Sequence, residues 1–180
     1  MKLLENNEIY LRALEPEDLD ALYRWENDTE IWQHGSTITP YSRFSLHNYL
    51  NNSLTQDIFQ SHQLRLIIGG RLNHKLLGTI DLYDFDPIHS RAGVGLLIDK
   101  NYRRQNIGFQ ALNLMWEYAT RILNLQQLYA YIPKNNEPSY RLFLKCGFVE
   151  SGLLESWLKT NSGFEDVWIM QKKPTFAPKQ

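Results

Sequence analysis

The change of hydrophobic period near Asp99 constrains the fold more than any other feature of the sequence. Before it, three consecutive segments are predicted to be β-strands, at 64–68, 77–83 and 92–98. After Asp99 the apolar residues recur at helical spacing as far as Asn124. Strands joined by short turns pair antiparallel, whereas a strand, a helix and a strand in succession form a parallel pair. The pattern therefore predicts a mixed sheet flanked by helices.

The flanking segments add further strands and helices to this arrangement. A strand at 9–13 precedes a helix that starts near Pro16, and a second helix is predicted at about 43–52. Another strand is predicted at 128–132, followed by a helix from Asn136 to Cys146 and by two final strands around the turn at 161–163. The strand that enters the long helix and the strand that leaves it are the predicted parallel pair.

The composition excludes several classes of protein. The chain has 180 residues, of which 43% are hydrophobic, so it is long enough to bury a core. We expect one domain over residues 1–173 and a loose tail at 174–180. The formal net charge is -1 and the charges are interspersed, which argues against a nucleic-acid partner. The N-terminal residues lack the apolar stretch of a signal peptide, and no run is long enough to span a membrane, so a cytoplasmic protein without a membrane partner is expected.

Cys146 is the only cysteine of the chain. This excludes an intramolecular disulfide and a cysteine-based zinc site, and no metal is expected. We predict that Cys146 is a small buried hydrophobic residue and not an acetylated nucleophile.

A basic loop lies between the strand that ends at Ile98 and the helix that begins near Gly108. A helix N-terminus offers unpaired N–H groups and a partial positive charge, which suit a pyrophosphate. Gly108 permits close approach of the backbone, Asn106 tolerates left-handed dihedral angles, and Arg103 and Arg104 add forked donors. The loop therefore predicts an anion site, although a solvated basic loop before an ordinary helix is an equal alternative.

Two motifs in order resemble a known family. Arg103-Arg-Gln-Asn-Ile-Gly108 resembles the Gln/Arg-x-x-Gly-x-Gly/Ala signature of GCN5-related N-acetyltransferases (GNATs), and residues 136–148 resemble their Asn-x-x-Ala/Ser…Gly-Phe helix. Residues 11–19 and Trp25-Glu-Asn resemble the branch of spermidine acetyltransferases and ribosomal-protein N-terminal acetyltransferases. The resemblance covers residues 8–171 and implies the GNAT fold, an α/β (α+β) fold with a mixed, mostly antiparallel central sheet, one splayed parallel strand pair and flanking helices.

The resemblance also implies acetyl-coenzyme A (acetyl-CoA) as cosubstrate and assigns the residues that bind it. In the family the pantetheine arm lies in the wedge between the splayed strands, which places it on the backbone of Leu97 and Ile98. Asn136 and Ser139 match positions that contact the same arm, and Lys145 matches one near the adenosine phosphates. The pyrophosphate-binding positions correspond to Arg103, Arg104, Gln105, Asn106, Ile107, Gly108 and Phe109.

Three positions depart from the family pattern. Asn106 replaces the first glycine of the signature, a modest change because asparagine also adopts positive φ. Phe143 stands where many relatives have the tyrosine that protonates the departing thiolate, and Gly93 stands where spermidine-acetylating relatives often have a glutamate that helps to deprotonate the amine. Gly93 and Gly95 are consistent with a bulge that opens the wedge or with a simple packing constraint.

Substitutes for the missing acid and base can be named. Tyr140 lies one helical turn before Phe143 and is the predicted acid, with a packing aromatic as the alternative. His89, Asp81 and Asp84 are candidates for a proton relay, with turn or surface polar groups as the alternative. Losing a positioned acid or base costs about 10²–10⁴-fold, but a thiol with a pKa of about 8.5 leaves readily near neutral pH.

The sequence predicts an N-acetyltransferase that acts on a primary amine by direct attack in a ternary complex, with a backbone N–H near Leu96 or Leu97 on the oxyanion. A polyamine, another small amine and a protein N-terminus stay open as acceptors, as does a homodimer, since dimers are common among similar proteins. The alternative function is an acyl-CoA-binding sensor or interaction module with little or no catalytic activity. An acidic and aromatic stretch could receive a cationic amine or could simply be a packed helix end: Trp25, Glu26, Asp28, Glu30 and Trp32.

Overall fold

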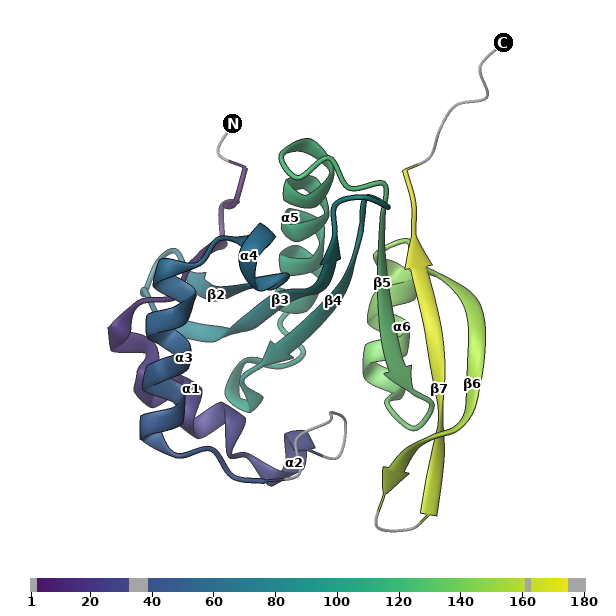
Figure 1. Ribbon diagram of the computed structural model, residues 1–180, viewed down its shortest axis with the longest axis horizontal. Helices are drawn as coiled ribbons and strands as arrows, with labels where there is room; N and C mark the ends of the chain where they lie inside the picture. The colour runs from purple at the N-terminus through teal and green to yellow at the C-terminus, as the bar shows by residue number, and fades with distance from the viewer. Residues whose placement is uncertain (1–2, 33–38, 161–162, 175–180) are drawn as a thin grey trace.

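A seven-stranded mixed sheet forms the centre of the computed structural model, which describes residues 3–32, 39–160 and 163–174 (Figure 1). The strand order is β1-β2-β3-β4-β5-β7-β6, and β4–β5 is the parallel pair while the other neighbours are antiparallel. The predicted fold class is thus confirmed. The strands are β1 (Ile9–Ala13), β2 (Leu64–Gly70), β3 (Leu76–Asp86), β4 (Arg91–Ile98), β5 (Gln127–Pro133), β6 (Val149–Thr160) and β7 (Gly163–Lys172).

Helices pack on both faces of the sheet. α1 (Leu19–Glu26) and α3 (Arg43–Thr55) cover one face, and α5 (Ile107–Arg121) and α6 (Glu137–Lys145) lie on the other (Figure 1). The alternation of side chains along β2 produces this division, because Ile67 joins the cluster of α1 and α3 while its neighbours Leu66 and Ile68 join the main core with α5.

Four short helical segments complete the part of the chain that the structure describes, and the pattern predicted only the first. The helix expected near Pro16 begins as the 3-10 turn η1 (Pro16–Asp18), whereas segments of three or four residues are too short to show a period. The unpredicted segments are α2 (Thr29–Trp32), α4 (Ile58–Ser61) and η2 (Lys100–Tyr102). Among the described helices, none has both the length and the apolar character needed to span a bilayer.

Two predicted features lie wholly or partly outside the described residues. These are the turn at 161–163 and the loose tail at 174–180, of which Gly163 and Pro174 alone are described.

Strands β4 and β5 separate soon after they meet. Their parallel pairing joins residues 91–93 to residues 127–129, and the rest of β5 pairs with β7 on its other side. The last part of β4, residues 94–98, pairs with β3 alone (Figure 1). One main-chain edge of β4 is therefore free of strand partners where the two strands diverge.

The bulge that Gly93 and Gly95 might have formed is absent. The pairing of β4 with β3 runs without a shift from Gly93 to Ile98, and the irregularity lies instead between Tyr83 and Asp86 of β3. An added Cβ at Gly93 would lie 2.2 Å from the ring of Tyr83, so this glycine makes room for a neighbouring side chain. The packing alternative is therefore the correct one for Gly93.

Gly78 fixes the position of the end of β4, which leads to a first prediction. Its φ is +155°, and an added Cβ would lie 2.0 Å from the carbonyl oxygen of Leu97. Because backbone cannot move aside as a side chain can, Gly78→Ala should lower the free energy of unfolding in urea by about 2 kcal/mol. The control is Gly152→Ala in β6, where the nearest atom to an added Cβ is 3.9 Å away. Equal stability of the two variants would contradict this account of Gly78.

Candidate active site

A cavity of about 690 Å³ lies beside the end of β4, between the N-terminal ends of α5 and α6. Of the twelve residues predicted to bind the cofactor, all but Gln105 line this cavity, whereas the Gln105 side chain donates to the Asn101 carbonyl oxygen at 3.3 Å. The cavity thus brings together segments that are separated by about forty residues in the chain. Its other lining residues are Glu30, Ile31, Leu96, Tyr102, Asn135, Pro138 and Leu142.

The turn that enters α5 has the geometry of an anion site. Arg104 and Asn106 both have left-handed dihedral angles, with φ of 62° and 60°. Gln110 is the first residue whose N–H is bonded back to the turn, at 3.2 Å from the Asn106 carbonyl oxygen, so the N–H groups of residues 107–109 have no acceptor within the helix. Within the described residues, the guanidinium groups of Arg103 and Arg104 have no ion-pair partner. Positive charge and free donors therefore meet at one end of the cavity.

Gly108 keeps this end of the cavity open. An added Cβ would lie 2.9 Å from Leu142 and 3.0 Å from Leu96, both of which line the cavity. Lys145 crosses from α6 to the same turn, where its Nζ donates to Oδ1 of Asn106 at 3.1 Å and lies 4.5 Å from the centre of the Phe109 ring. A cation from α6 is thus held next to the turn.

The N-terminal end of α6 forms the opposite wall. Oδ1 of Asn136 accepts a hydrogen bond from the N–H of Ser139 at 3.3 Å, so Asn136 caps the helix that it precedes. Phe143 is buried against Phe148 at 4.8 Å between ring centres, and it faces the core. The position of the usual acid is therefore filled by a packing residue.

The candidate acid Tyr140 is engaged elsewhere in this conformation. Its hydroxyl donates to the Glu150 carboxylate on β6, and this hydrogen bond raises the pKa of Tyr140. Tyr140 is not among the described residues that line the cavity. To act as an acid, the hydroxyl has to leave Glu150, and the role stays a prediction.

Cys146 is buried, as the sequence predicts, with 4% of its surface exposed. Burial raises the pKa of its thiol to about 11, so the thiol is protonated at neutral pH. A protonated thiol is a poor nucleophile.

On the face covered by α1 and α3, strand β4 presents two glycines before Leu97. Cross-strand partners share a face, so Gly95 lies beside Asp81 of β3 and Gly93 lies beside Tyr83. At Gly95 an added Cβ would be 3.8 Å from Oδ2 of Asp81 and 3.8 Å from the Tyr83 ring, which is ordinary van der Waals contact. Gly95 therefore leaves a small recess, directly before the cavity-lining part of β4, with a carboxylate oxygen in its wall.

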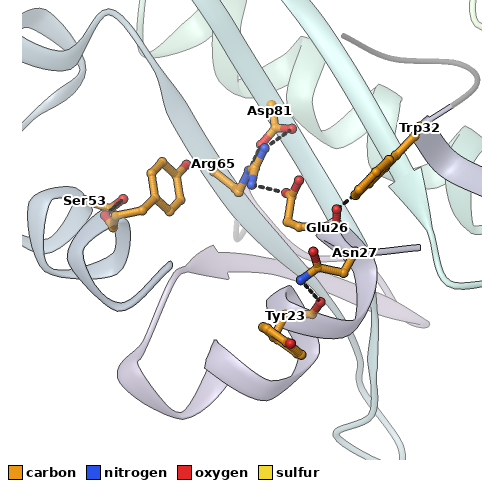
Figure 2. Close-up of polar contacts among 8 residues, drawn as sticks. Tyr23, Glu26, Asn27, Trp32, Ser53, Arg65 and Asp81 are labelled. Carbon is orange, nitrogen blue, oxygen red and sulfur yellow. Dashed lines mark hydrogen bonds and ion pairs between the residues drawn. The ribbon is translucent and has the colours of Figure 1, made fainter. Parts of the chain in front are cut away.

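Arg65 of β2 holds this carboxylate in place (Figure 2). Its Nε donates to Oδ1 of Asp81 at 2.6 Å and its Nη1 to Oε1 of Glu26 at 2.5 Å. Burial alone would lower the pKa of Arg65, but the charges of Asp81 and Glu26 raise it. Because the three charged side chains are 16–19% exposed and include two carboxylates for one guanidinium, the group keeps one negative charge close to the recess.

Tyrosine rings extend the same face toward β5. Tyr83 packs on Tyr129 at 6.0 Å between ring centres, and Tyr129 packs on Tyr131 at 5.6 Å. Burial and the neighbouring Asp84 raise the pKa of Tyr129 to about 12, so its ring is neutral at physiological pH and can attract a cation. The Tyr129 hydroxyl lies 3.5 Å from Oδ2 of Asp84, and the main-chain N–H of the exposed His89 donates to Asp86. The relay roles of Asp81, Asp84 and His89 stay predictions.

The structure divides the acidic and aromatic stretch. Trp25 is buried. Glu26 binds Arg65, and the indole N–H of Trp32 donates to the Glu26 carbonyl oxygen at 2.6 Å (Figure 2). Glu30 alone lines the cavity. The role of Arg65 was not predicted from the sequence, although a single arginine within an apolar strand segment indicates a buried ion pair.

Comparisons with known proteins agree with this geometry. The family model described as "Acetyltransferase (GNAT) domain" matches residues 8–149. A spermidine N(1)-acetyltransferase of Vibrio cholerae is 27% identical, with 93% of this chain and 96% of the relative covered. A spermidine N(1)-acetyltransferase of Escherichia coli K12 is 25% identical over 81% of this chain and 75% of the relative.

A solved structure shows the same fold. The crystal structure of the Vibrio cholerae spermidine N-acetyltransferase in complex with CoA and spermine superposes with a TM-score of 0.86, at 24% identity, over 93% of this chain and 96% of that one. Since the family model covers most of the chain and the fold agrees with it, this chain belongs to the GNAT acetyltransferase family and is an acetyl-CoA-dependent N-acetyltransferase.

Proposed function

We propose that this N-acetyltransferase acetylates a small cationic amine of the polyamine class and binds acetyl-CoA in the cavity beside β4. One observation carries the proposal: the cavity has free main-chain donors and arginines at one end, and a recess with a carboxylate in its wall lies at Gly95, directly before the cavity-lining residues of β4. A diphosphate fits the first environment and an alkylammonium group fits the second.

The residues present fit acetyl-CoA. The N–H groups of residues 107–109 suit the diphosphate, with Arg103 and Arg104 beside them. The free edge of β4 at Leu97 and Ile98 suits the amide groups of the pantetheine arm, which can pair with it as a strand would. Asn136, Ser139 and Lys145 close the cavity from α6.

The bound cosubstrate supplies a thioester whose carbonyl carbon accepts the amine. The lone pair of the neutral amine forms the new C–N bond, the electrons of the carbonyl move to oxygen, and a main-chain N–H near Leu96 or Leu97 stabilises that oxyanion. The carbonyl then re-forms as the C–S bond breaks, and the thiolate leaves with its electron pair. The proton that the nitrogen loses passes to the thiolate, directly or through water, so the products are the acetylated amine and the free thiol of CoA. No covalent intermediate on the protein is required, which agrees with the protonated state of Cys146.

The acceptor is inferred from charge. Arg65 neutralises only one of its two carboxylate partners, Glu30 lies at the cavity, and tyrosine rings flank the recess. These features favour a cation over a neutral or anionic amine. Two of the relatives are named spermidine N(1)-acetyltransferases, which supports the same class. The homodimer stays a prediction. The spermidine N-acetyltransferase from Vibrio cholerae has a dodecameric structure.

The direct test is mass spectrometry of an amine panel incubated with acetyl-CoA and the protein. The panel contains spermidine, spermine, a neutral-tailed monoamine and a peptide with a free N-terminus. We expect acetylated polyamine as the main product. Acetylation of the peptide alone would contradict the proposed acceptor, and cofactor binding without any product would favour the sensor.

Charge at the turn should control cofactor affinity. Arg103→Glu together with Arg104→Glu should raise the Kd for CoA in calorimetry by about tenfold or more, because two phosphate-facing cations become anions. Arg121→Glu at the exposed far end of α5 is the control for charge reversal and should leave the Kd unchanged. Equal affinity of all three proteins would remove the diphosphate from this turn.

The recess should control acceptor affinity. Asp81→Asn should raise the KM for the amine by about tenfold, with the Kd for CoA unchanged, and the remaining Arg65–Glu26 pair stays balanced in charge. Gly95→Ala should raise the same KM because it fills the recess without a clash. Gly152→Ala is its matched control in β6. An unchanged KM in both recess variants would place the amine elsewhere.

Tyr140 offers a separate prediction about the acid. If its hydroxyl protonates the leaving thiolate, Tyr140→Phe lowers kcat by about tenfold or more and removes the corresponding limb of the pH–rate profile. Glu150→Gln, which weakens the competing hydrogen bond, should leave kcat equal or higher. A Tyr140→Phe variant with normal kcat would show that the thiolate leaves without this acid.

A further inference from the structure

A buried carboxylate connects the turn of the cofactor cavity with helix α1. Asp99 directly follows β4 and is 6% exposed. Its Oδ2 accepts a hydrogen bond from the indole Nε1 of Trp25 at 2.8 Å, and Trp25 itself is 3% exposed. The residues lie 74 positions apart in the chain, so this bond ties two distant segments together.

The other oxygen of Asp99 organises the turn. Oδ1 accepts hydrogen bonds from the main-chain N–H and the side-chain amide of Asn101, both at 3.0 Å. The Asp99 carbonyl oxygen accepts from the N–H of Tyr102 at 2.8 Å, and the Asn101 carbonyl oxygen accepts from the side chain of Gln105. Asp99 therefore determines the path of the chain from β4 into the segment that presents Arg103.

The helix on the other side of the bond leads to the same cavity. Trp25 lies at the end of α1, and its carbonyl oxygen accepts from the N–H of Asp28 at 3.2 Å. The following helix α2 has no buried residue, so its place depends on α1, and it contributes Glu30 and Ile31 to the cavity. The Asp99–Trp25 hydrogen bond thus links the turn to the segment that leads into α2, together with the longer ion pairs Arg24–Asp99 and Lys100–Asp28, both at 3.9 Å.

We propose that Asp99 is a positioning residue that holds the phosphate-binding turn and the α1–α2 segment in register through its bond with Trp25, so that loss of this bond weakens cofactor and acceptor binding together. Only a carboxylate can accept at both oxygens. An asparagine at this position offers one acceptor oxygen and has to give up either Trp25 or Asn101. The inference rests on the proposed placement of the diphosphate at the turn.

Two tryptophans permit a matched test. Trp25→Phe removes the N–H that binds Asp99, and Trp32→Phe removes an N–H that binds the Glu26 carbonyl oxygen without touching the turn. Each change keeps an aromatic ring and removes the same donor, an indole N–H group. Calorimetry with CoA, acetyl-transfer kinetics with the best amine of the panel and urea unfolding are measured for both variants, for Asp99→Asn and for the double variant Trp25→Phe/Asp99→Asn.

We expect Trp25→Phe and Asp99→Asn each to raise the Kd for CoA and the KM for the amine by about fivefold to tenfold, while kcat at saturation changes by less than about twofold. The effects of the two single changes should not add in the double variant, because both act on the hydrogen bonds of one carboxylate. Trp32→Phe should leave the Kd for CoA unchanged. If the changes only lowered stability, the midpoint of urea unfolding would fall, but KM would not rise while kcat stayed constant.

Two results would overturn the inference. One is a wild-type Kd for CoA in both Trp25→Phe and Asp99→Asn, and the other is an equal weakening of CoA binding in Trp32→Phe. Failure of the wild-type protein to bind CoA at all would instead contradict the proposed function, since no variant is then involved.

Discussion

The brief pairing of β4 with β5 is the constraint on which the site depends. After residues 91–93 the two strands diverge, and the end of β4 is left with β3 as its one strand partner. Main-chain groups near the middle of a domain have to be satisfied by protein, water or ligand. An extended ligand with amide groups can satisfy them as a strand would. The edge of β4 that lacks a strand neighbour is therefore where we propose that the cofactor binds.

Charge is separated along the resulting cavity. The turn before α5 gathers free N–H groups, Arg103 and Arg104, whereas the face beyond the strand edge carries Asp81 and Glu26, only partly neutralised by Arg65. An anionic cosubstrate and a cationic acceptor can therefore approach from different sides without competing for the same groups. In the proposed function, the reacting atoms meet at the end of β4.

The sequence predicted the strands and most helices well, because their hydrophobic periods are local signals, and eleven of the twelve residues that it assigned to the cofactor line one cavity. It could not predict contacts between distant segments. The structure buries Ala21, Leu22 and Trp25 of α1, and the partner of the Trp25 indole is Asp99, which lies 74 positions further along the chain. The packing role of Gly93 likewise depends on a cross-strand ring that only the register reveals.

A crystal structure with CoA and spermidine bound together tests the central claim most directly. We expect the diphosphate to bind the main-chain N–H groups at the start of α5 and the pantetheine arm to lie along the free edge of β4. A primary amine of spermidine should lie beside Asp81. A turn without bound phosphate, or a pantetheine arm that lies away from β4, would contradict this claim.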